Sequence, residues 1–107
     1  MKSLEQLTDS VFYIMAAFSK PKHGYAVMSE IEELTEGEVK IGPASLYTII
    51  KKLMGEEYIM LYDDSDSRRK VYLLTEKGRS VLQYDMIRRQ KMIHFAQIGL
   101  EGDVSND

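Results

Sequence analysis

The sequence predicts a mainly α-helical domain with a small β-hairpin and a long C-terminal helix. Three observations lead to this fold class. A short segment, 40–53, has apolar residues at helical spacing and a proline near its start. Two strand-like segments separated by a polar turn follow it. Helical spacing of apolar residues then returns from residue 76 to about residue 98.

The segment 40–53 carries the strongest functional signal in the chain. Pro43 fits the first position of a helix, where the N–H that proline lacks would have no partner. The residues that recur at helical spacing and face a core are Leu46, Ile49, Ile50 and Leu53. The small, hydroxylated and cationic residues of the opposite face and its flanks are Ala44, Ser45, Tyr47, Thr48, Lys51 and Lys52. Such a helix fits a DNA major groove, and an ordinary surface helix is the alternative.

The residues after this helix predict a β-hairpin. Segments 58–62 and 69–74 are rich in aromatic and branched side chains, and the turn between them is polar. The basic residues near the tip are Arg68, Arg69 and Lys70. Helices joined by a short turn and followed by such a hairpin predict a winged helix-turn-helix domain over residues 1–75. In that architecture the third helix enters the major groove, and the wing contacts phosphate or the minor groove.

Two further helices are predicted before the central one. The first begins either near Ser3, which opens a capping-box pattern, or at Thr8. The second begins at His23, and its residues predicted to face inward are Val27, Met28, Ile31 and Leu34. In the loop that follows, Val39 and Ile41 are expected to form a short strand beside the hairpin.

The last predicted helix is longer than a winged domain needs. Thr75 is expected to cap its start, and Glu76 suits the positive end of the helix dipole. The helix is predicted to run to about Ile98 within a dimerisation segment, 76–100, and residues 101–107 are predicted to be a disordered tail. Its apolar residues exceed what one face can bury within a monomer, so we predict a homodimer. A helix that folds back on its own domain is the alternative.

Length and composition exclude several classes of protein. With 107 residues, the chain can form one small domain and an added helix, without a separate catalytic domain. The absence of cysteine excludes disulfides, thiolate zinc sites and cysteine nucleophiles, and it fits a reducing compartment. Without a run of ~18 apolar residues or a secretory signal, a cytoplasmic protein that does not contact membranes is expected. No metal-ligand spacing or glycine-rich phosphate loop occurs, so no cofactor, metal or catalytic residue is predicted.

The net charge of −3 is unusual for a DNA-binding protein, because cations that neutralise phosphates supply most of the nonspecific affinity. The acidic residues concentrate in segments 30–38 and 63–66 and in the tail, whereas basic residues lie in the turn, the third helix and the hairpin. This distribution predicts one basic face and DNA binding that weakens steeply with salt. The acidic total also supports the alternative function, a winged-helix protein-interaction module that does not bind DNA.

Three blocks of sequence occur in an order typical of one family. They are HGYAVMSEIEEL at 23–34, IGPASLYTIIKKL at 41–53 and RRKVYLLTEKG at 68–78. Together they closely resemble the PadR family of bacterial transcriptional regulators. The resemblance implies a homodimeric repressor whose C-terminal helix forms the dimer interface. Two third helices would then occupy successive major grooves of a pseudo-palindromic site in double-stranded DNA.

The resemblance also implies which residues contact DNA. The contacts come from the third helix, the start of the second helix and the hairpin. They are Lys22, Tyr25, Ser45, Tyr47, Thr48, Lys51, Lys52, Arg68, Arg69 and Lys70. The alternatives are that the tyrosines pack their rings against the core and that the lysines are solvated charges.

The short C-terminus resembles a compact subgroup of the family, in which some members are similar to sensors of aromatic compounds. The predicted dimer interface consists of Leu4, Leu7, Val11, Leu82, Met86, Ile93, Ala96 and Leu100. A small aromatic or apolar effector would bind between the subunits near Tyr84, Met92 and Phe95, because methionine adapts to irregular apolar ligands. The chain lacks tryptophan, on which a flat ligand would stack, so simple packing at the interface is the alternative for these three residues.

Overall fold

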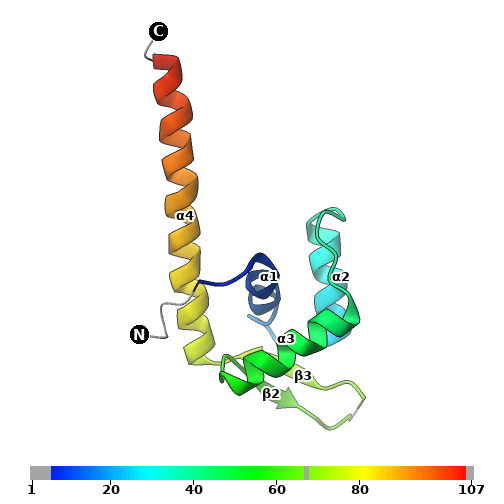
Figure 1. Cartoon of the computed structure of the whole chain (residues 1–107). Coiled ribbons are helices and arrows are strands. Elements are labelled where there is room, and N and C mark those ends of the chain that lie inside the picture. Colours follow the sequence, from blue (N-terminus) through cyan, green and yellow to red (C-terminus); the bar gives the residue numbers. More distant parts are fainter. Residues whose placement is uncertain (1–5, 67, 106–107) are drawn as a thin grey trace.

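The computed structural model describes residues 6–66 and 68–105 and is mainly helical, with one small sheet. Its elements are α1 (Asp9–Ala17), β1 (Lys22–His23), α2 (Gly24–Leu34), α3 (Pro43–Gly55), β2 (Ile59–Asp63), β3 (Val71–Leu74) and α4 (Glu76–Ser105). Figure 1 shows α1, α2 and α3 grouped around the sheet, while α4 extends away from them. The extents of 63 × 35 × 20 Å reflect this projecting helix. The predicted fold class is confirmed.

The sheet has three antiparallel strands in the order β1-β3-β2. Strands β2 and β3 form the predicted hairpin, called the wing below, with a register shift between Leu61 and Asp63. The prediction of a strand at Val39 and Ile41 was wrong, because β1 occupies that edge and pairs His23 with Val71. The Val39 N–H instead donates to the Thr35 hydroxyl at 3.1 Å, which keeps this segment a loop.

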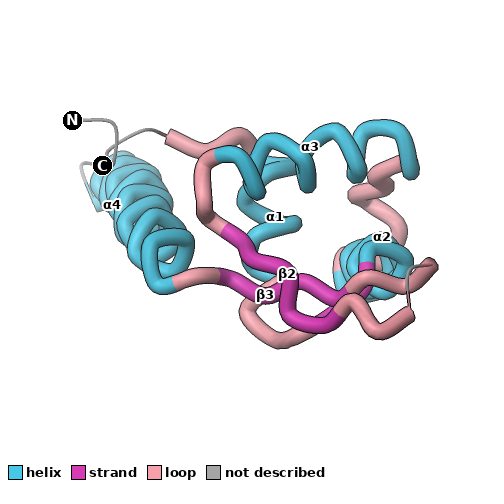
Figure 2. The backbone as a smooth tube through the Cα atoms, turned by 90° about the horizontal axis from the view of Figure 1, so that it is seen from below, coloured by secondary structure: helices cyan, strands magenta, loops and turns pink. Residues whose placement is uncertain are grey.

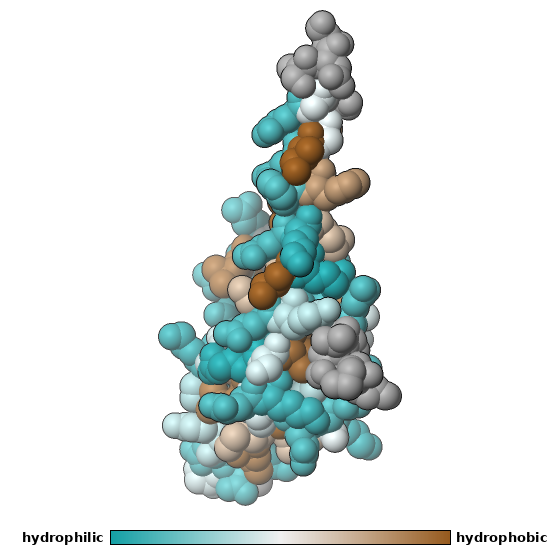
Figure 3. All heavy atoms as spheres, turned by 90° about the vertical axis from the view of Figure 1, so that its left-hand side faces the viewer, coloured by the Kyte–Doolittle hydropathy of each residue, from teal (hydrophilic) through white to brown (hydrophobic). Residues whose placement is uncertain are grey.

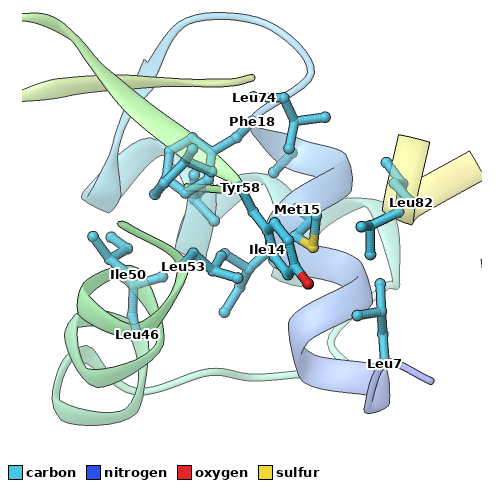
Figure 4. Packing of buried hydrophobic residues seen from close by; sticks show 14 of the residues in the cluster. Leu7, Ile14, Met15, Phe18, Leu46, Ile50, Leu53, Tyr58, Leu74 and Leu82 are labelled. Atoms are coloured by element: carbon cyan, nitrogen blue, oxygen red, sulfur yellow. The ribbon is translucent and has the colours of Figure 1, made fainter. Parts of the chain in front are cut away.

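The core lies between α1, α3, the sheet and the first turns of α4. Figure 4 shows Ile14 and Met15 of α1 beside Tyr58, and Phe18, which follows α1, beside Leu74. The Phe18 ring also meets the Tyr72 ring edge to face at 5.8 Å. In α2, Val27 and Ile31 are buried as predicted, whereas Leu34 is 75% exposed. Leu34 ends α2 at the rim of a groove between α1 and α2, where no other described segment covers it.

Both capping threonines act at helix starts. The Thr8 hydroxyl accepts a hydrogen bond from Val11 N, so α1 starts at the later of its two predicted positions. The earlier one, Ser3, lies outside the described residues. Thr75 caps α4 as predicted, since its hydroxyl accepts from Gly78 N at 2.9 Å and donates to Glu57 O at 2.6 Å.

Helix α4 continues to Ser105, past its predicted end near Ile98 and into the segment predicted to be disordered. Gly99 and Gly102 each cost about 1 kcal/mol relative to alanine. No proline interrupts the segment, however, so each added residue gains one backbone hydrogen bond. Within the described residues, no helix combines the length and apolar character needed to cross a membrane.

A buried carboxylate fixes α4 against the segment that leads into α1. Asp85 is fully buried, and its oxygens accept from Arg88 Nε at 2.8 Å and Arg89 Nε at 2.7 Å. Arg89 also donates to the Leu7 carbonyl at 3.1 Å and to Asp9 at 3.0 Å, and it stacks over Phe12 at 4.3 Å. These contacts set the direction in which α4 leaves the domain.

Candidate nucleic-acid interface

The start of α2 and the middle of α3 touch closely at Gly24. A Cβ atom at this position would lie 2.6 Å from the Tyr47 hydroxyl oxygen and 3.2 Å from Leu46 Cδ2. Glycine therefore allows the two helices to approach as a helix-turn-helix requires. The same contact holds the Tyr47 side chain over the start of α2.

The outer face of α3 is exposed to solvent. Leu46, Ile50 and Leu53 are buried, as the apolar spacing predicted. The exposed polar and cationic side chains of the opposite face are Ser45, Thr48, Lys51 and Lys52. Among the described residues, none offers these four side chains a hydrogen bond or an ion pair. Figure 2 views the molecule from the end that α3 and the wing form together.

A hollow of about 740 Å³ lies between the start of α2, α3 and the wing. Its lining is aromatic and cationic, and it consists of His23, Gly24, Tyr25, Tyr47, Arg68, Arg69, Lys70 and Tyr72. Five of the ten predicted DNA contacts line this hollow, namely Tyr25, Tyr47, Arg68, Arg69 and Lys70, and two more, Ser45 and Thr48, line a shallow hollow on α3. Tyr25 is 66% exposed, so its ring is not part of the core.

The tyrosines at this hollow lie close enough to influence each other. Burial raises the pKa of the Tyr72 hydroxyl above its ordinary value, and the nearby Tyr47 hydroxyl adds to the shift. Tyr72 therefore stays neutral at physiological pH, and it does not add negative charge where phosphate would approach.

Lys22 does not join the other predicted contacts. Its Nζ donates to the Ala17 carbonyl at 2.9 Å and lies 3.4 Å from Glu30 Oε1, and its side chain is only 20% exposed. These partners lie on α1 and α2, away from the hollow, so the ammonium closes the groove between those helices.

His23 was not predicted as a site residue, yet its ring reaches the wing. Its Nε2 lies 3.0 Å from Arg69 Nη2, across 46 residues of sequence. The sequence suggested only a turn or capping role, and the His23 backbone does cap α2 without a side-chain hydrogen bond. Pairing between β1 and β3, which sequence periodicity does not reveal in a strand of two residues, brings the two side chains together.

The predicted dimer residues divide into buried and exposed groups. Leu7 and Leu82 lie in the monomer core, at 6% and 7% exposure, so little of their surface is left for a partner. Val11 packs partly against the same core, and Leu4 lies outside the described residues. The exposed members, all on α4, are Met86, Ile93, Ala96 and Leu100. Figure 3 shows apolar side chains along the projecting part of α4.

The three predicted effector residues are also exposed on α4. Tyr84, Met92 and Phe95 are 44%, 57% and 81% exposed. Of these three residues, Phe95 alone lines the hollow of about 520 Å³ that is described on this helix. The other residues that line this hollow are Ile87, Gln90, Lys91, His94 and Ile98. The Met92 sulfur instead accepts a contact from Arg88 Nη1 at 3.3 Å. The monomer therefore does not gather the three side chains into one pocket.

A comparison with protein-family models matches residues 11–84 to the transcriptional regulator PadR-like family. The matched segment runs from α1 through the helix-turn-helix and the wing into α4. The chain belongs to this family. Its members are transcriptional regulators and not enzymes. Among its described residues, no group of three His, Cys, Asp or Glu side chains could hold a metal ion.

One curated protein and several solved structures are similar to this chain, and the structures share its fold. The chain is 35% identical over 66 residues to the uncharacterised protein X of Lysinibacillus sphaericus, a match that covers 59% of this chain and 61% of that protein. The match to a chain in the complex structure of hsRosR-S4 covers 99% of this chain and 97% of that chain, with a TM-score of 0.70 and 16% sequence identity. A PadR family transcriptional regulator from Eggerthella lenta has a TM-score of 0.65 and 22% identity over 84% of this chain and 78% of its own.

Proposed function

We propose that this PadR-like regulator represses transcription as a homodimer that reads a pseudo-palindromic DNA site. The observation that carries the proposal is the unpaired polar face of α3, which lies at the same end of the molecule as the basic wing. Side chains without partners in the protein can bind base edges and phosphates without first breaking other contacts. Ser45, Thr48 and Lys51 face the major groove in this arrangement, and Tyr25, Arg68, Arg69 and Lys70 face the DNA backbone.

The homodimer forms through the projecting part of α4. Met86, Ile93 and Leu100 recur every seven residues, which places them on one stripe of the helix, and all three are more than 40% exposed. Pairing of two such stripes buries apolar surface that the monomer leaves in water. A two-fold dimer of this kind presents its two α3 helices to half-sites about one helical turn apart.

A small aromatic or apolar effector releases the repressor from DNA in this proposal. The support is the exposed cluster of large apolar side chains along α4, including Tyr84, Met92 and Phe95. A ligand that binds between two α4 helices can change the separation of the two α3 helices. It shifts the population only through different affinities for the two arrangements.

The proposal is tested by selecting DNA from a pool of random duplexes and comparing variants on the selected site. We expect Lys51→Ala to weaken binding about fivefold to tenfold and to reduce the slope of log affinity against log salt by about one if the ammonium contacts phosphate. Lys91→Ala removes an equal charge from α4, outside the proposed DNA interface. We expect this variant to bind DNA with the affinity of the wild type.

Two results would contradict the proposal. One is a pool that yields no enriched sequence, which would favour a protein-interaction module. The other is an equal loss of affinity in both lysine variants, which would show that only total charge matters. Repression is tested separately by placing the selected site in a promoter upstream of a reporter, whose expression should fall when the wild-type protein is present.

A further inference from the structure

The three cations of the wing differ in their contacts. Arg68, Arg69 and Lys70 are all exposed. Of these three side chains, only that of Arg69 has a hydrogen-bonding partner among the described residues. That partner is the ring of His23. The Nε2 to Nη2 distance of 3.0 Å is that of a good hydrogen bond. One wing cation is thus held in place, while its two neighbours are free to move.

The backbone at His23 makes this contact well defined. His23 lies in β1, pairs with Val71 of β3 and caps the start of α2. Its Cα is therefore fixed by both the sheet and the helix, and its ring leads to the hollow that Tyr25 and Tyr47 also line. Arg69 lies just before β3 in the turn of the wing, where its backbone N–H donates to the Asp66 carbonyl at 2.9 Å.

The chemistry of the two groups fixes their roles. A guanidinium only donates hydrogen bonds, so His23 Nε2 is the acceptor in this contact. The other cationic or phenolic groups at the hollow are Tyr25, Tyr47, Arg68, Lys70 and Tyr72, and no carboxylate of a described residue lines it. The nearby Lys22 is directed to Glu30 and Ala17. Among the described residues that line the hollow, Arg69 therefore has no anionic partner that would compete with His23.

We propose that His23 is a positioning residue of the DNA interface, which holds the Arg69 guanidinium over the hollow between α2, α3 and the wing. The inference rests on the proposed function, since it names how one wing cation is presented to a DNA phosphate. A long arginine side chain loses rotamer freedom when it binds, and a hydrogen bond formed before binding lowers that cost. His23 acts through Arg69 and needs no contact of its own with DNA.

The test is a double-mutant cycle with fluorescence anisotropy on the duplex selected from the random pool. We expect His23→Ala and Arg69→Ala each to weaken binding, the histidine variant by about fivefold. The double variant should bind no more weakly than Arg69→Ala alone, because His23 works only through that arginine. Lys70→Ala, which removes a neighbouring cation with no partner, should instead combine additively with His23→Ala.

Conservative variants separate positioning from a structural role. His23→Gln places an amide oxygen near the site of Nε2 and should restore most of the affinity. His23→Asn places its amide nearer to Nδ1 and should not restore it. Thermal unfolding of each variant reports whether the fold is kept, and we expect the Asn variant to be at least as stable as the Gln variant, because His23 is the N-cap of α2 and asparagine suits that position.

Several outcomes would overturn the inference. They are additive losses in the cycle with Arg69, equal rescue by asparagine and glutamine, or unchanged affinity in His23→Ala. If the wild-type protein binds no duplex at low salt, the proposed function itself fails and the inference fails with it. If the wild-type protein binds and the cycle is additive, only the role of His23 is rejected.

Discussion

At Gly78 the first turn of α4 touches the backbone of Tyr58 directly. A Cβ atom there would collide with the Tyr58 carbonyl oxygen and lie 2.8 Å from its carbon. Gly78→Ala should therefore destabilise the protein by about 2 kcal/mol, although alanine is the better helix former. Urea unfolding monitored by circular dichroism measures the change.

Gly99 provides the matched control for Gly78, since both lie in α4 and nothing lies within 4 Å of a Cβ built at Gly99. Gly99→Ala should stabilise the protein by up to about 1 kcal/mol. If both alanine variants were stabilising, the close approach of α4 to Tyr58 would be incorrect.

Asp85 links stability to pH. Burial raises the pKa of its carboxyl group, but hydrogen bonds from Arg88, Arg89 and the Leu7 N–H outweigh burial, so the pKa is lowered below 3.8. A lowered folded-state pKa means that this stabilisation is complete above the unfolded-state pKa and is lost as the pH falls through the folded-state value. The contribution should therefore disappear in acid.

Asp85→Asn should reduce the free energy of unfolding by about 2–3 kcal/mol at pH 7, because two arginines lose their anionic partner. The difference from the wild type should shrink as the pH falls below about 4, because the Asp85 carboxylate of the unfolded state is protonated there while the native carboxylate keeps its charge to lower pH. Urea unfolding at a series of pH values measures it. Asp9→Asn, at the 84% exposed end of the same network, should cost less than about 1 kcal/mol. A pH-independent difference for Asp85→Asn would contradict this account.

Individual residues were predicted from the sequence where the signal is local. Thr75 was identified as a cap because a cap acts on residues two or three positions away. Asp85, His23 and Gly78 were not identified, because each acts through a partner distant in sequence, such as Leu7 N for Asp85 at 3.3 Å. On the sequence alone, Asp85 resembles any charged residue of a solvated helix.

At the scale of elements, the apolar period predicted α3, whereas the hairpin was predicted from two segments rich in aromatic and branched side chains with a polar turn between them. Strand β1 was missed, since two residues have no period and their partners in β3 lie about fifty positions away. A segment as short as the strand predicted at Val39 also has no period that could confirm or exclude it. The end of α4 was also missed, because its polar residues carry no stop signal and no apolar period.

The exposed apolar stripe on α4, formed by Met86, Ile93 and Leu100, predicts where two subunits meet. Ile93→Glu places a charge where two helices would pair and should convert the dimer to a monomer in sedimentation equilibrium, with a dissociation constant raised at least about a hundredfold. Ile87→Glu is the matched control, since Ile87 and Ile93 are 52% and 58% exposed on different faces of α4. Dimers that survive Ile93→Glu, or that are lost only in Ile87→Glu, would place the interface on another face.

At the scale of the whole molecule, the shape explains how a protein with a net negative charge can present a surface that binds DNA. α3 and the wing form one end of the molecule, and α4 leads away from it (Figure 1). The net charge of −3 therefore does not describe the surface that would meet DNA. Acidic side chains such as Glu32 and Glu33 are exposed on α2, outside the hollow between α2, α3 and the wing.

The most direct measurement is fluorescence anisotropy of the wild-type protein with duplex from its own upstream region and with a scrambled duplex, across a salt series. The native duplex alone should bind tightly. Its affinity should fall roughly a hundredfold between 50 and 200 mM salt if the dimer neutralises about four phosphates. Equal, feeble binding to both duplexes, or affinity that does not change with salt, would contradict the assignment of α3 and the wing as a sequence-specific DNA interface.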